Sequence, residues 1–131
     1  MRKQPLPPLL LIVIGLLVVS CGTLAGATQV PEPSKLHMVI HSVDTNTSTE
    51  KNVSSLDSVQ KVYDHIRALP AVPAGQVCTL MAGPTYDLTF SRDGAIVLIA
   101  KADAGGCGTV KLSDKDIRLA DKELWQMLNE A

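Results

Sequence analysis

The side chains with the greatest chemical potential in this chain are three cysteines, three histidines and a group of carboxylates near the C-terminus. Cysteine thiols can form disulfides, carry a lipid or bind a metal, and imidazoles can bind a metal or transfer protons. These residues are Cys21, Cys78, Cys107, His37, His41 and His65. Their spacing decides which of these chemistries the chain can support.

The spacing of the histidines and carboxylates argues against a metal centre. His37 and His41 lie in a segment rich in β-formers, and on a strand they would share one face about 13 Å apart, too far for one ion. Four carboxylates follow later, at Asp114, Asp116, Asp121 and Glu123. They alternate with lysines and lack the glycine of a calcium loop. We therefore expect no metal site and no cofactor, and a solvated surface of mixed charge around the carboxylates.

No nucleophile stands in a sequence context typical of catalysis. The serines are many, but none lies in Gly-x-Ser-x-Gly, and no set of serine, histidine and aspartate has a spacing that indicates proximity. The glycine-rich stretch 105–108 is expected to open a strand, whereas a phosphate-binding loop opens a helix. The prediction is a protein that is not an enzyme.

The first 20 residues have the parts of an export signal. Arg2 and Lys3 supply a positive start, and residues 9–19, LLLIVIGLLVV, supply an apolar run. A helix of this length spans about 16 Å, which is short of the roughly 30 Å of a bilayer core. The segment is therefore predicted to direct export rather than to span a membrane.

The end of this apolar run resembles the lipobox of bacterial lipoproteins. It reads Val18-Val19-Ser20-Cys21-Gly22, with valine at the first position where leucine is commonest. The resemblance implies cleavage between Ser20 and Cys21, and a diacylglyceryl lipid on the thiol of Cys21. An alternative is an ordinary secretory signal cut near residues 25–27, which would discard Cys21.

The chain then divides into a tether and one domain. Residues 1–20 form the predicted signal peptide, 21–35 the lipidated cysteine and a tether, and 36–131 a single domain. The tether is rich in small residues and proline, so it cannot bury enough surface to fold. After removal of the signal peptide with Arg2 and Lys3, the chain has 10 basic and 13 acidic residues, a net charge of −3. This balance offers no basic surface for nucleic acid, and the lipid is expected to hold the domain on the outer face of the cell membrane.

If Cys21 carries a lipid, Cys78 and Cys107 remain as a pair in an oxidising compartment. Such a pair predicts a structural disulfide closing a loop of about 30 residues, worth roughly 3–4 kcal/mol in the chain-entropy model. The alternative is a redox or metal-binding pair. The chain has no Cys-x-x-Cys motif, and its histidines lie far from both cysteines in the sequence.

Hydrophobic periodicity predicts an α+β domain. We expect a strand at 36–43 with apolar neighbours on both faces, a polar loop at 44–54, and an amphipathic helix from Ser55 to Leu69 that begins with a Ser54-x-x-Asp57 capping box. Four strands follow in this interpretation, over 77–82, 86–91, 95–102 and 107–112, with a hairpin turn at 92–94. Asp121 is expected to cap a short last helix. Together these form a mainly antiparallel sheet of four to five strands, with one packed helix and a short C-terminal helix.

The mature region also resembles small secreted or lipid-anchored bacterial proteins of unknown role. The shared features are Leu69-Pro70, Cys78, the alternating stretch 86–90 (YDLTF) and Gly106-Cys107-Gly108. This resemblance supports the fold and the disulfide and implies no activity.

Three functions remain open from the sequence. The preferred one is a binding module at the cell envelope, with contacts from Asp87, Thr89, Ser91, Arg92 and Asp93 to an envelope protein or polymer. The second is an inhibitor or accessory subunit of an exported enzyme, using the proline-rich segment 69–75 as a rigid insert. The third, a small-molecule enzyme, would need a pocket with convergent polar groups. A flat exposed patch would favour the first, and a prominent fixed loop with a hydrophobic tip the second.

Overall fold

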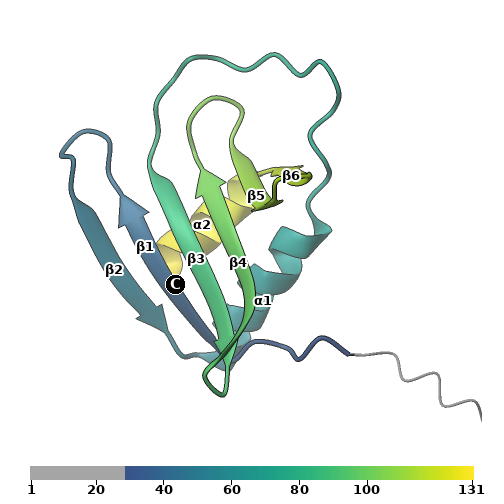
Figure 1. The fold of residues 1–131 in the computed structure, drawn as a ribbon. Helices are drawn as coiled ribbons and strands as arrows, with labels where there is room; N and C mark the ends of the chain where they lie inside the picture. The colour runs from purple at the N-terminus through teal and green to yellow at the C-terminus, as the bar shows by residue number, and fades with distance from the viewer. Residues whose placement is uncertain (1–28) are drawn as a thin grey trace, which may run out of the picture.

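The structure, a computed structural model, describes residues 29–131 and has one antiparallel sheet with two helices (Figure 1). The strand order is β2-β1-β3-β4-β5-β6, and every neighbouring pair is antiparallel. The elements are β1 (Lys35–His41), β2 (Ser48–Val53), α1 (Leu56–Ala68), β3 (Thr85–Arg92), β4 (Ala95–Asp103), β5 (Thr109–Ser113), β6 (Asp116–Leu119) and α2 (Lys122–Glu130).

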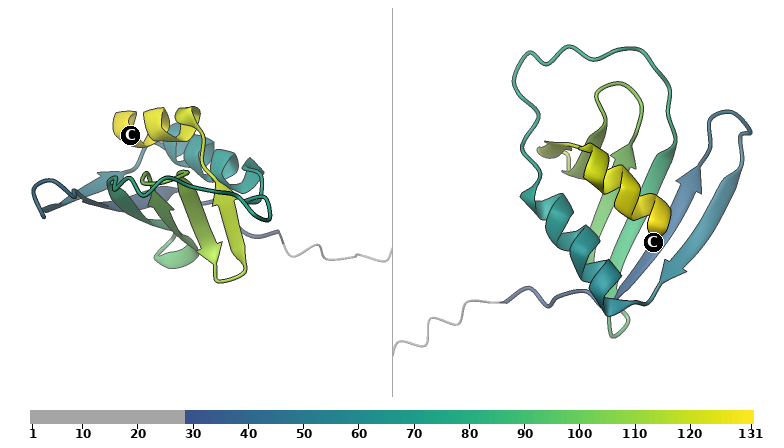
Figure 2. Two further views of the ribbon diagram at one scale, coloured as in Figure 1. Left: turned by 90° about the horizontal axis from the view of Figure 1, so that it is seen from above. Right: turned by 180° about the vertical axis from the view of Figure 1, so that it is seen from behind.

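Both helices cover the same face of the sheet, and the core lies between them and the strands (Figure 2). Alternate residues of β3 supply the middle of this core, because successive side chains of a strand point to opposite faces. Tyr86, Leu88 and Phe90 are buried there. The four buried residues of α1 follow the spacing of one helical face: Val59, Val62, Tyr63 and Ile66. Within residues 29–131, no helix covers the other face of the sheet.

The few aromatic residues anchor both helices to the sheet. Tyr63 of α1 meets Phe90 edge to face, with ring centroids 5.4 Å apart. Trp125 of α2 lies 5.9 Å from Tyr86. Aromatic pairs of this kind add about 0.5–1.5 kcal/mol beyond the burial of their area. Burial raises the pKa of the Tyr86 hydroxyl.

The predicted α+β class is confirmed, but the strand count is not. The sheet has six strands: one of the five expected ranges, 77–82, forms no strand, and two short strands were not predicted. The first is β2, within the segment 44–54 that was expected to be a polar loop, and the second is β6. β2 is an edge strand in which only Val53 is both apolar and buried, so it lacks the apolar alternation by which strands are recognised.

Three local predictions were wrong. Residues 77–82 form no strand but part of a long loop. The Ser54-x-x-Asp57 capping box does not form, because Ser55 is the N-cap residue of α1 and makes no side-chain capping bond. Val43 is about half exposed, and in the part of the chain that the structure describes no element covers the face of β1 opposite the core, so β1 is not enclosed on both faces.

The hairpin turn and the last helix are as predicted. Asp93 and Gly94 both have positive φ between β3 and β4, as a two-residue turn requires. The side chain of Asp121 accepts a hydrogen bond of 2.9 Å from the N–H of Leu124 at the start of α2. None of the helices in residues 29–131 has the length and apolar character needed to cross a membrane.

The tether enters the domain at the end of the sheet that carries the β3–β4 hairpin. The N–H of Ser34 donates to the carbonyl of Ser91 (2.9 Å), and Arg92 Nη1 donates to the carbonyl of Glu32 (2.8 Å). Pro33 is fully buried. The last residues of the predicted tether therefore already belong to the packed domain.

Candidate binding loop and the helix-free face

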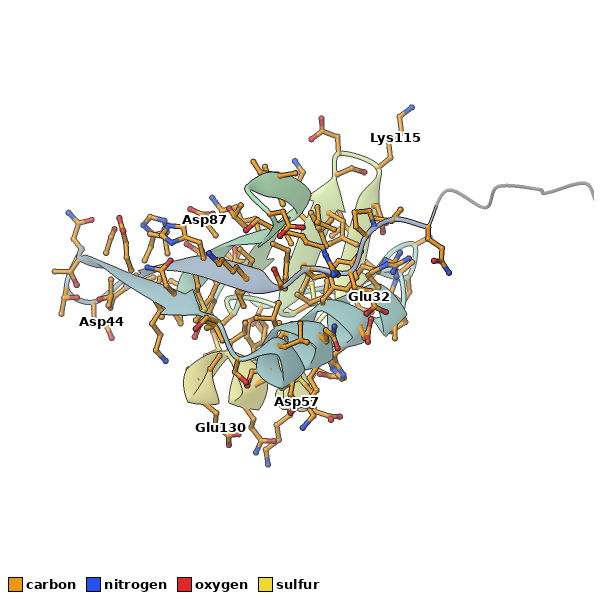
Figure 3. All side chains as sticks on the ribbon, turned by 90° about the horizontal axis from the view of Figure 1, so that it is seen from below. Glu32, Asp44, Asp57, Asp87, Lys115 and Glu130 are labelled. Carbon is orange, nitrogen blue, oxygen red and sulfur yellow. A yellow bond between two sulfur atoms is a disulfide. The ribbon has the colours of Figure 1, made fainter. Side chains whose placement is uncertain are left out.

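The predicted contact surface divides between two places in the fold. Asp87, Thr89 and Ser91 alternate with the buried residues of β3, so they lie on the helix-free face of the sheet. Figure 3 shows Asp87 on the side of the sheet away from the helices. Arg92 and Asp93 lie at the β3–β4 hairpin, where Arg92 also binds the entering chain at Glu32.

The helix-free face carries a polar network that the sequence did not indicate. His41 Nδ1 lies 2.8 Å from Ser48 Oγ, and His41 Nε2 lies 2.7 Å from Asp87 Oδ2. Because a carboxylate only accepts, Nε2 donates to Asp87. Lys101 Nζ lies 3.8 Å from the other oxygen of Asp87. One histidine thus links side chains of three strands, and it brings together a serine and an aspartate whose proximity nothing in the sequence context indicated.

The surroundings of this grouping do not suit acyl transfer. Ser48, His41 and Asp87 lie on the open surface of a sheet, and the side chains of His41 and Asp87 are each more than 40% exposed. Hydrolysis by a serine requires N–H donors aimed at the developing oxyanion. The N–H groups of β1 and β3, which are interior strands, pair with their neighbours instead. The network is therefore best understood as a polar tie between strands.

His37 and His41 share this face, as expected, but each has its own partner. His37 Nδ1 lies 2.9 Å from Asn52 Oδ1, whereas His41 binds Ser48 and Asp87. The contacts with Asn52 and Ser48 both reach across to β2. They account for the two imidazoles as links to the edge strand.

Three side chains between the helices have the types that bind metals. Ligand atoms of His65, Asp121 and Glu123 lie within 4.8 Å of one another. Asp121 already accepts from the N–H of Leu124, and its carboxylate lies 2.8 Å from His65 Nε2. Partial burial opposes ionisation of Asp121, but these two partners hold its pKa below the usual value. A helix cap with an added ion pair explains this cluster.

The other carboxylates of this region also have local partners. Hydrogen bonding to Lys111 lowers the pKa of Asp114, and hydrogen bonding to Arg118 lowers that of Asp116. Both pairs join residues close in sequence, at 2.7 Å each. The solvated surface of mixed charge expected here agrees with these contacts.

The most distinctive segment is the loop of residues 69–84, which joins α1 to β3. In Figure 1 it runs in a wide arc beyond the ends of β3 and β4. Pro70 ends the helix because it cannot continue the backbone hydrogen bonding. The first part of the loop then lies along β6: the N–H of Leu119 donates to the carbonyl of Pro70 (2.8 Å), and that of Val72 donates to Ile117 (3.1 Å).

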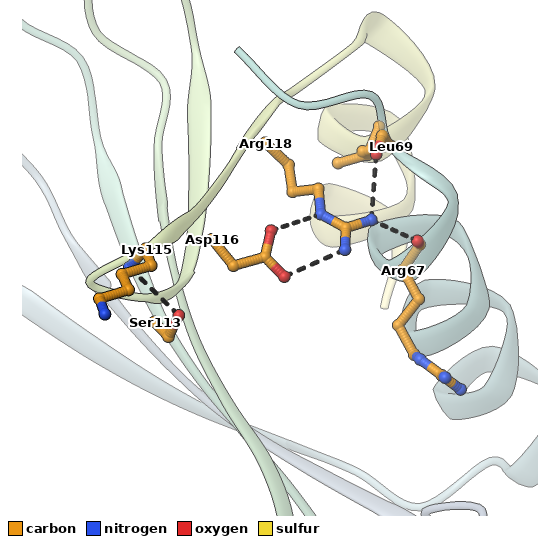
Figure 4. Close-up of polar contacts among 6 residues, drawn as sticks. All are labelled: Arg67, Leu69, Ser113, Lys115, Asp116 and Arg118. Carbon is orange, nitrogen blue, oxygen red and sulfur yellow. Dashed lines mark hydrogen bonds and ion pairs between the residues drawn. The ribbon is translucent and has the colours of Figure 1, made fainter.

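The side chain of Arg118, on β6, also binds the start of the loop (Figure 4). Its guanidinium forms two hydrogen bonds with Asp116, of 2.7 and 3.0 Å. Its Nη1 also donates to the carbonyls of Arg67 and Leu69, at the end of α1. Since these carbonyls have no partner within the helix, the bonds satisfy the helix end and fix the start of the loop.

The second part of the loop is held by the turn between β4 and β5. Cys78 and Cys107 form the predicted disulfide, with their Cα atoms 5.0 Å apart. Three residues after Cys78, the carbonyl of Met81 accepts a hydrogen bond of 2.8 Å from the N–H of Gly106. The N–H of Ala104 donates to the carbonyl of Pro84 (3.0 Å) where the loop enters β3.

The glycines of that turn allow the loop backbone to approach closely. A Cβ at Gly105 would lie 2.7 Å from the carbonyl oxygen of Met81, and one at Gly106 would lie 3.2 Å from that of Thr79. A Cβ at Gly83, in the loop itself, would lie 2.7 Å from the backbone of Ala104 and Gly105. The glycine-rich stretch is thus the backing against which the loop main chain packs.

Between these fixed points the loop presents apolar side chains to solvent. Leu80 is fully exposed, with a relative accessibility of 106%, while Val77 reaches 87% and Met81 reaches 71%. Nothing in folding favours three large apolar side chains in water at one place. We call residues 77–81 the apex of the loop.

The apex was not predicted because its sequence pattern is typical of a strand. Val77, Leu80 and Met81 surround Cys78 in a short apolar run that ends at Gly83-Pro84, and such runs usually lie in sheets. The proline-rich segment 69–75 was expected to be the insert, but its start is bound along β6. A usable signal was the 16-residue connection with its cysteine, since loops of that length in compact domains are often functional.

Comparisons with known proteins identified no relative of this chain. No significant match was found to a protein-family model, to a curated protein sequence or to a solved structure. The predicted cleavage and lipidation positions, Ser20 and Cys21, lie outside the described residues.

Proposed function

We propose that the domain is an inhibitor of an exported endopeptidase and that its apex inserts into the substrate cleft of that enzyme. The observation that supports this most directly is the combination of a fully exposed Leu80 with a backbone held on both sides of it. This is the fixed loop with a hydrophobic tip that favours the inhibitor hypothesis over a flat contact surface.

The apex suits a cleft that receives a peptide segment. Residues 76–84 belong to no helix or strand, and the disulfide of Cys78 and the backbone hydrogen bonds of Met81 and Pro84 all lead to the segment that joins β4 to β5. The opposite side is free to contact another protein. Leu80 would enter an apolar specificity pocket of the kind found in chymotrypsin-like enzymes. Because the loop is already ordered, little conformational entropy is lost on binding.

The same contacts favour an inhibitor over a substrate. Proteases with such pockets cleave the bond that follows the residue in the pocket, which here is the bond between Leu80 and Met81. Cys78 on one side of this bond is held by the disulfide, and Met81 on the other by Gly106. Both new chain ends would stay attached to the same turn, so they would leave the cleft slowly.

We also propose that the protein is a lipoprotein, held on the extracytoplasmic side of a membrane by a lipid on Cys21. The lipobox-like sequence supports this location, and the disulfide is consistent with an oxidising compartment. The position of the apex fits as well. β3 separates the tether end, near Arg92, from the loop end, near Thr85, by about 23 Å. The apex would therefore face away from the membrane, toward soluble enzymes.

Inhibition assays test the proposed activity. The full lipoprotein in detergent is titrated against subtilisin and chymotrypsin, which have apolar pockets, and against trypsin, whose pocket carries an aspartate. We expect tight inhibition of at least one of the first two, weak inhibition of trypsin, and loss of inhibition in Leu80→Ala. No inhibition of any endopeptidase with an apolar pocket would overturn the proposal.

The mass of the protein extracted from membranes tests the anchor separately. We expect a chain that begins at Cys21 and carries the mass of a diacylglyceryl group. Cys21→Ser should release an unlipidated protein to the medium or periplasm. An unmodified chain that begins near residue 27 would overturn the anchor and leave the inhibition assay unaffected.

A further inference from the structure

The apex contains a methionine whose exposure sets it apart from the other methionines of the described chain. Met81 has a relative accessibility of 71%, whereas Met38 is fully buried in the core and Met127 is partly buried against it. The Cys78 and Cys107 sulfurs are joined in a disulfide, so neither is a free thiol that would react first. Thioether oxidation follows exposure.

We propose that Met81 is a reversible oxidation site that switches off binding by the apex. The inference rests on the proposed inhibitory function. In the reaction, a peroxide transfers one oxygen atom to the Met81 sulfur. The sulfur is oxidised by two electrons to the sulfoxide, the O–O bond breaks, and hydrogen peroxide is reduced to water. A methionine sulfoxide reductase reverses the step using a dithiol, which becomes a disulfide.

The position of Met81 explains why one oxygen atom would matter. Its side chain follows Leu80 directly and projects from the same exposed stretch. An enzyme that encloses Leu80 must also cover Met81, so the side chain moves from water into the contact. A sulfoxide is strongly polar, and burying it without a hydrogen-bond donor opposes association.

The change would be confined to the contact surface. Met81 is bound to the fold through its carbonyl, which accepts from the N–H of Gly106, and its side chain is not part of the core. Oxidation therefore leaves the disulfide and the loop backbone in place. The switch would act on affinity without unfolding the domain.

The experiment treats the full lipoprotein with dilute hydrogen peroxide and measures two quantities. Peptide mass spectrometry follows the addition of one oxygen at Met81, Met38 and Met127. Inhibition of the most sensitive endopeptidase from the panel is measured in parallel. We expect Met81 to be oxidised first, with at least a tenfold rise in the inhibition constant that methionine sulfoxide reductase reverses.

Met81→Leu is the matched control, since it keeps size and apolar character but has no sulfur. Because Met81 is part of the contact, the inhibition constant of this variant is compared with itself, and it should be the same before and after peroxide. Equal oxidation of Met81 and Met127, or an oxidised protein that inhibits as before, would overturn the proposal. An untreated protein that inhibits nothing would refute the inhibitory function, and the switch with it, while the order of oxidation would still be measured.

Discussion

The helix-free face and the apex are both exposed, but they are built in opposite ways. On the face, polar side chains bind one another: His41 joins Ser48 to Asp87, and Lys101 approaches the same carboxylate. At the apex three apolar side chains, Val77, Leu80 and Met81, are exposed to water, while the backbone is held by the disulfide and by Gly106.

This difference separates what folding explains from what it does not. The polar network contributes to joining β2, β1 and β3, so it requires no partner outside the chain. The apex gains nothing from its exposed leucine, and the contacts behind it hold that leucine in place. Surfaces that are ordered, apolar and unpaired are typical of binding sites.

Removing the disulfide should have the largest effect, because it removes the principal covalent restraint on the apex. Cys78→Ser with Cys107→Ser is expected to lower the free energy of unfolding by about 3–4 kcal/mol. Chemical denaturation followed by circular dichroism measures this loss. The unbraced loop should also be cut by subtilisin within the apex.

Retention of full inhibition by the double serine variant, with no cleavage after long incubation, would contradict the bracing role of the disulfide. A variant that fails to fold would not decide the point. In that case the folded parent is compared with and without a mild reductant at a temperature where both forms keep their far-ultraviolet spectrum.

Replacing Leu80 by lysine should come next in size. A lysine cannot enter an apolar pocket without desolvating its charge, so Leu80→Lys should weaken inhibition of the apolar-pocket enzyme by at least about 30-fold, the loss expected at a binding hot spot. The same variant should gain inhibition of trypsin. Inhibition constants for both enzymes measure this change of specificity.

Ile99→Lys is the matched control for that exchange. Ile99 is also exposed, at 59%, but it lies on β4 opposite Thr89 on the helix-free face. The two variants place the same charged side chain on the helix-free face and at the apex. If Ile99→Lys weakened inhibition as much as Leu80→Lys, the contact with the enzyme would lie on the helix-free face rather than at the apex.

Gly105→Ala should displace the loop without touching its exposed side chains. The added Cβ would lie 2.7 Å from the carbonyl oxygen of Met81, so the backbone must shift. Inhibition should weaken about tenfold, or 1.4 kcal/mol. Gly94→Ala, in the hairpin at the far end of β3, strains a positive φ but meets no atom within 4 Å. It should lower stability while leaving inhibition unchanged.

The two regions also differ in how far the sequence predicts them. The alternation Tyr86, Leu88, Phe90 and the Asp93-Gly94 turn are local patterns, and β3, its hairpin and its solvent-facing residues were predicted correctly. The disulfide was expected from its compartment and is present. The strand and its turn depend on residues that are close in sequence, whereas the disulfide, whose cysteines are 29 residues apart, was predictable from the number of cysteines and the expected compartment.

The apex and the polar network depend on contacts between distant residues. The segment around Leu80 packs its backbone against Gly105 and Gly106, some 25 residues later, and this contact keeps Leu80 out of the sheet and exposed to solvent. Ser48 was placed in a loop, so its approach to His41 and Asp87 could not be anticipated. A strand pattern at 77–82 is overridden by the disulfide and the glycine turn that hold this segment outside the sheet.

Asp121→Ala should affect stability and leave the apex unchanged. Loss of the helix cap is expected to cost about 1 kcal/mol. The pKa of Asp121 is lowered in the folded protein, so the contribution of its charge is complete above the usual aspartate pKa and is lost as pH falls through the folded-state value. The difference in thermal unfolding temperature between the parent and the variant should therefore become smaller in acid.

Asp121→Asn separates the cap from the charge. An amide oxygen can still accept the N–H of Leu124 but cannot titrate. This variant should keep most of the stability and show a weaker dependence on acid than the parent. A parent and an alanine variant that remain equally far apart down to strongly acidic pH would contradict the role of the ionised carboxylate.

Asp87→Asn should have the smallest effect, although it changes the centre of the polar network. It removes the charge that faces His41 and Lys101, both at solvent-exposed positions, and exposed ion pairs contribute less than about 1 kcal/mol. Inhibition of the apolar-pocket enzyme should equal that of the parent. A loss of inhibition comparable to that of Leu80→Lys, in a variant that unfolds at the parent's denaturant concentration, would move the binding site from the apex to the helix-free face.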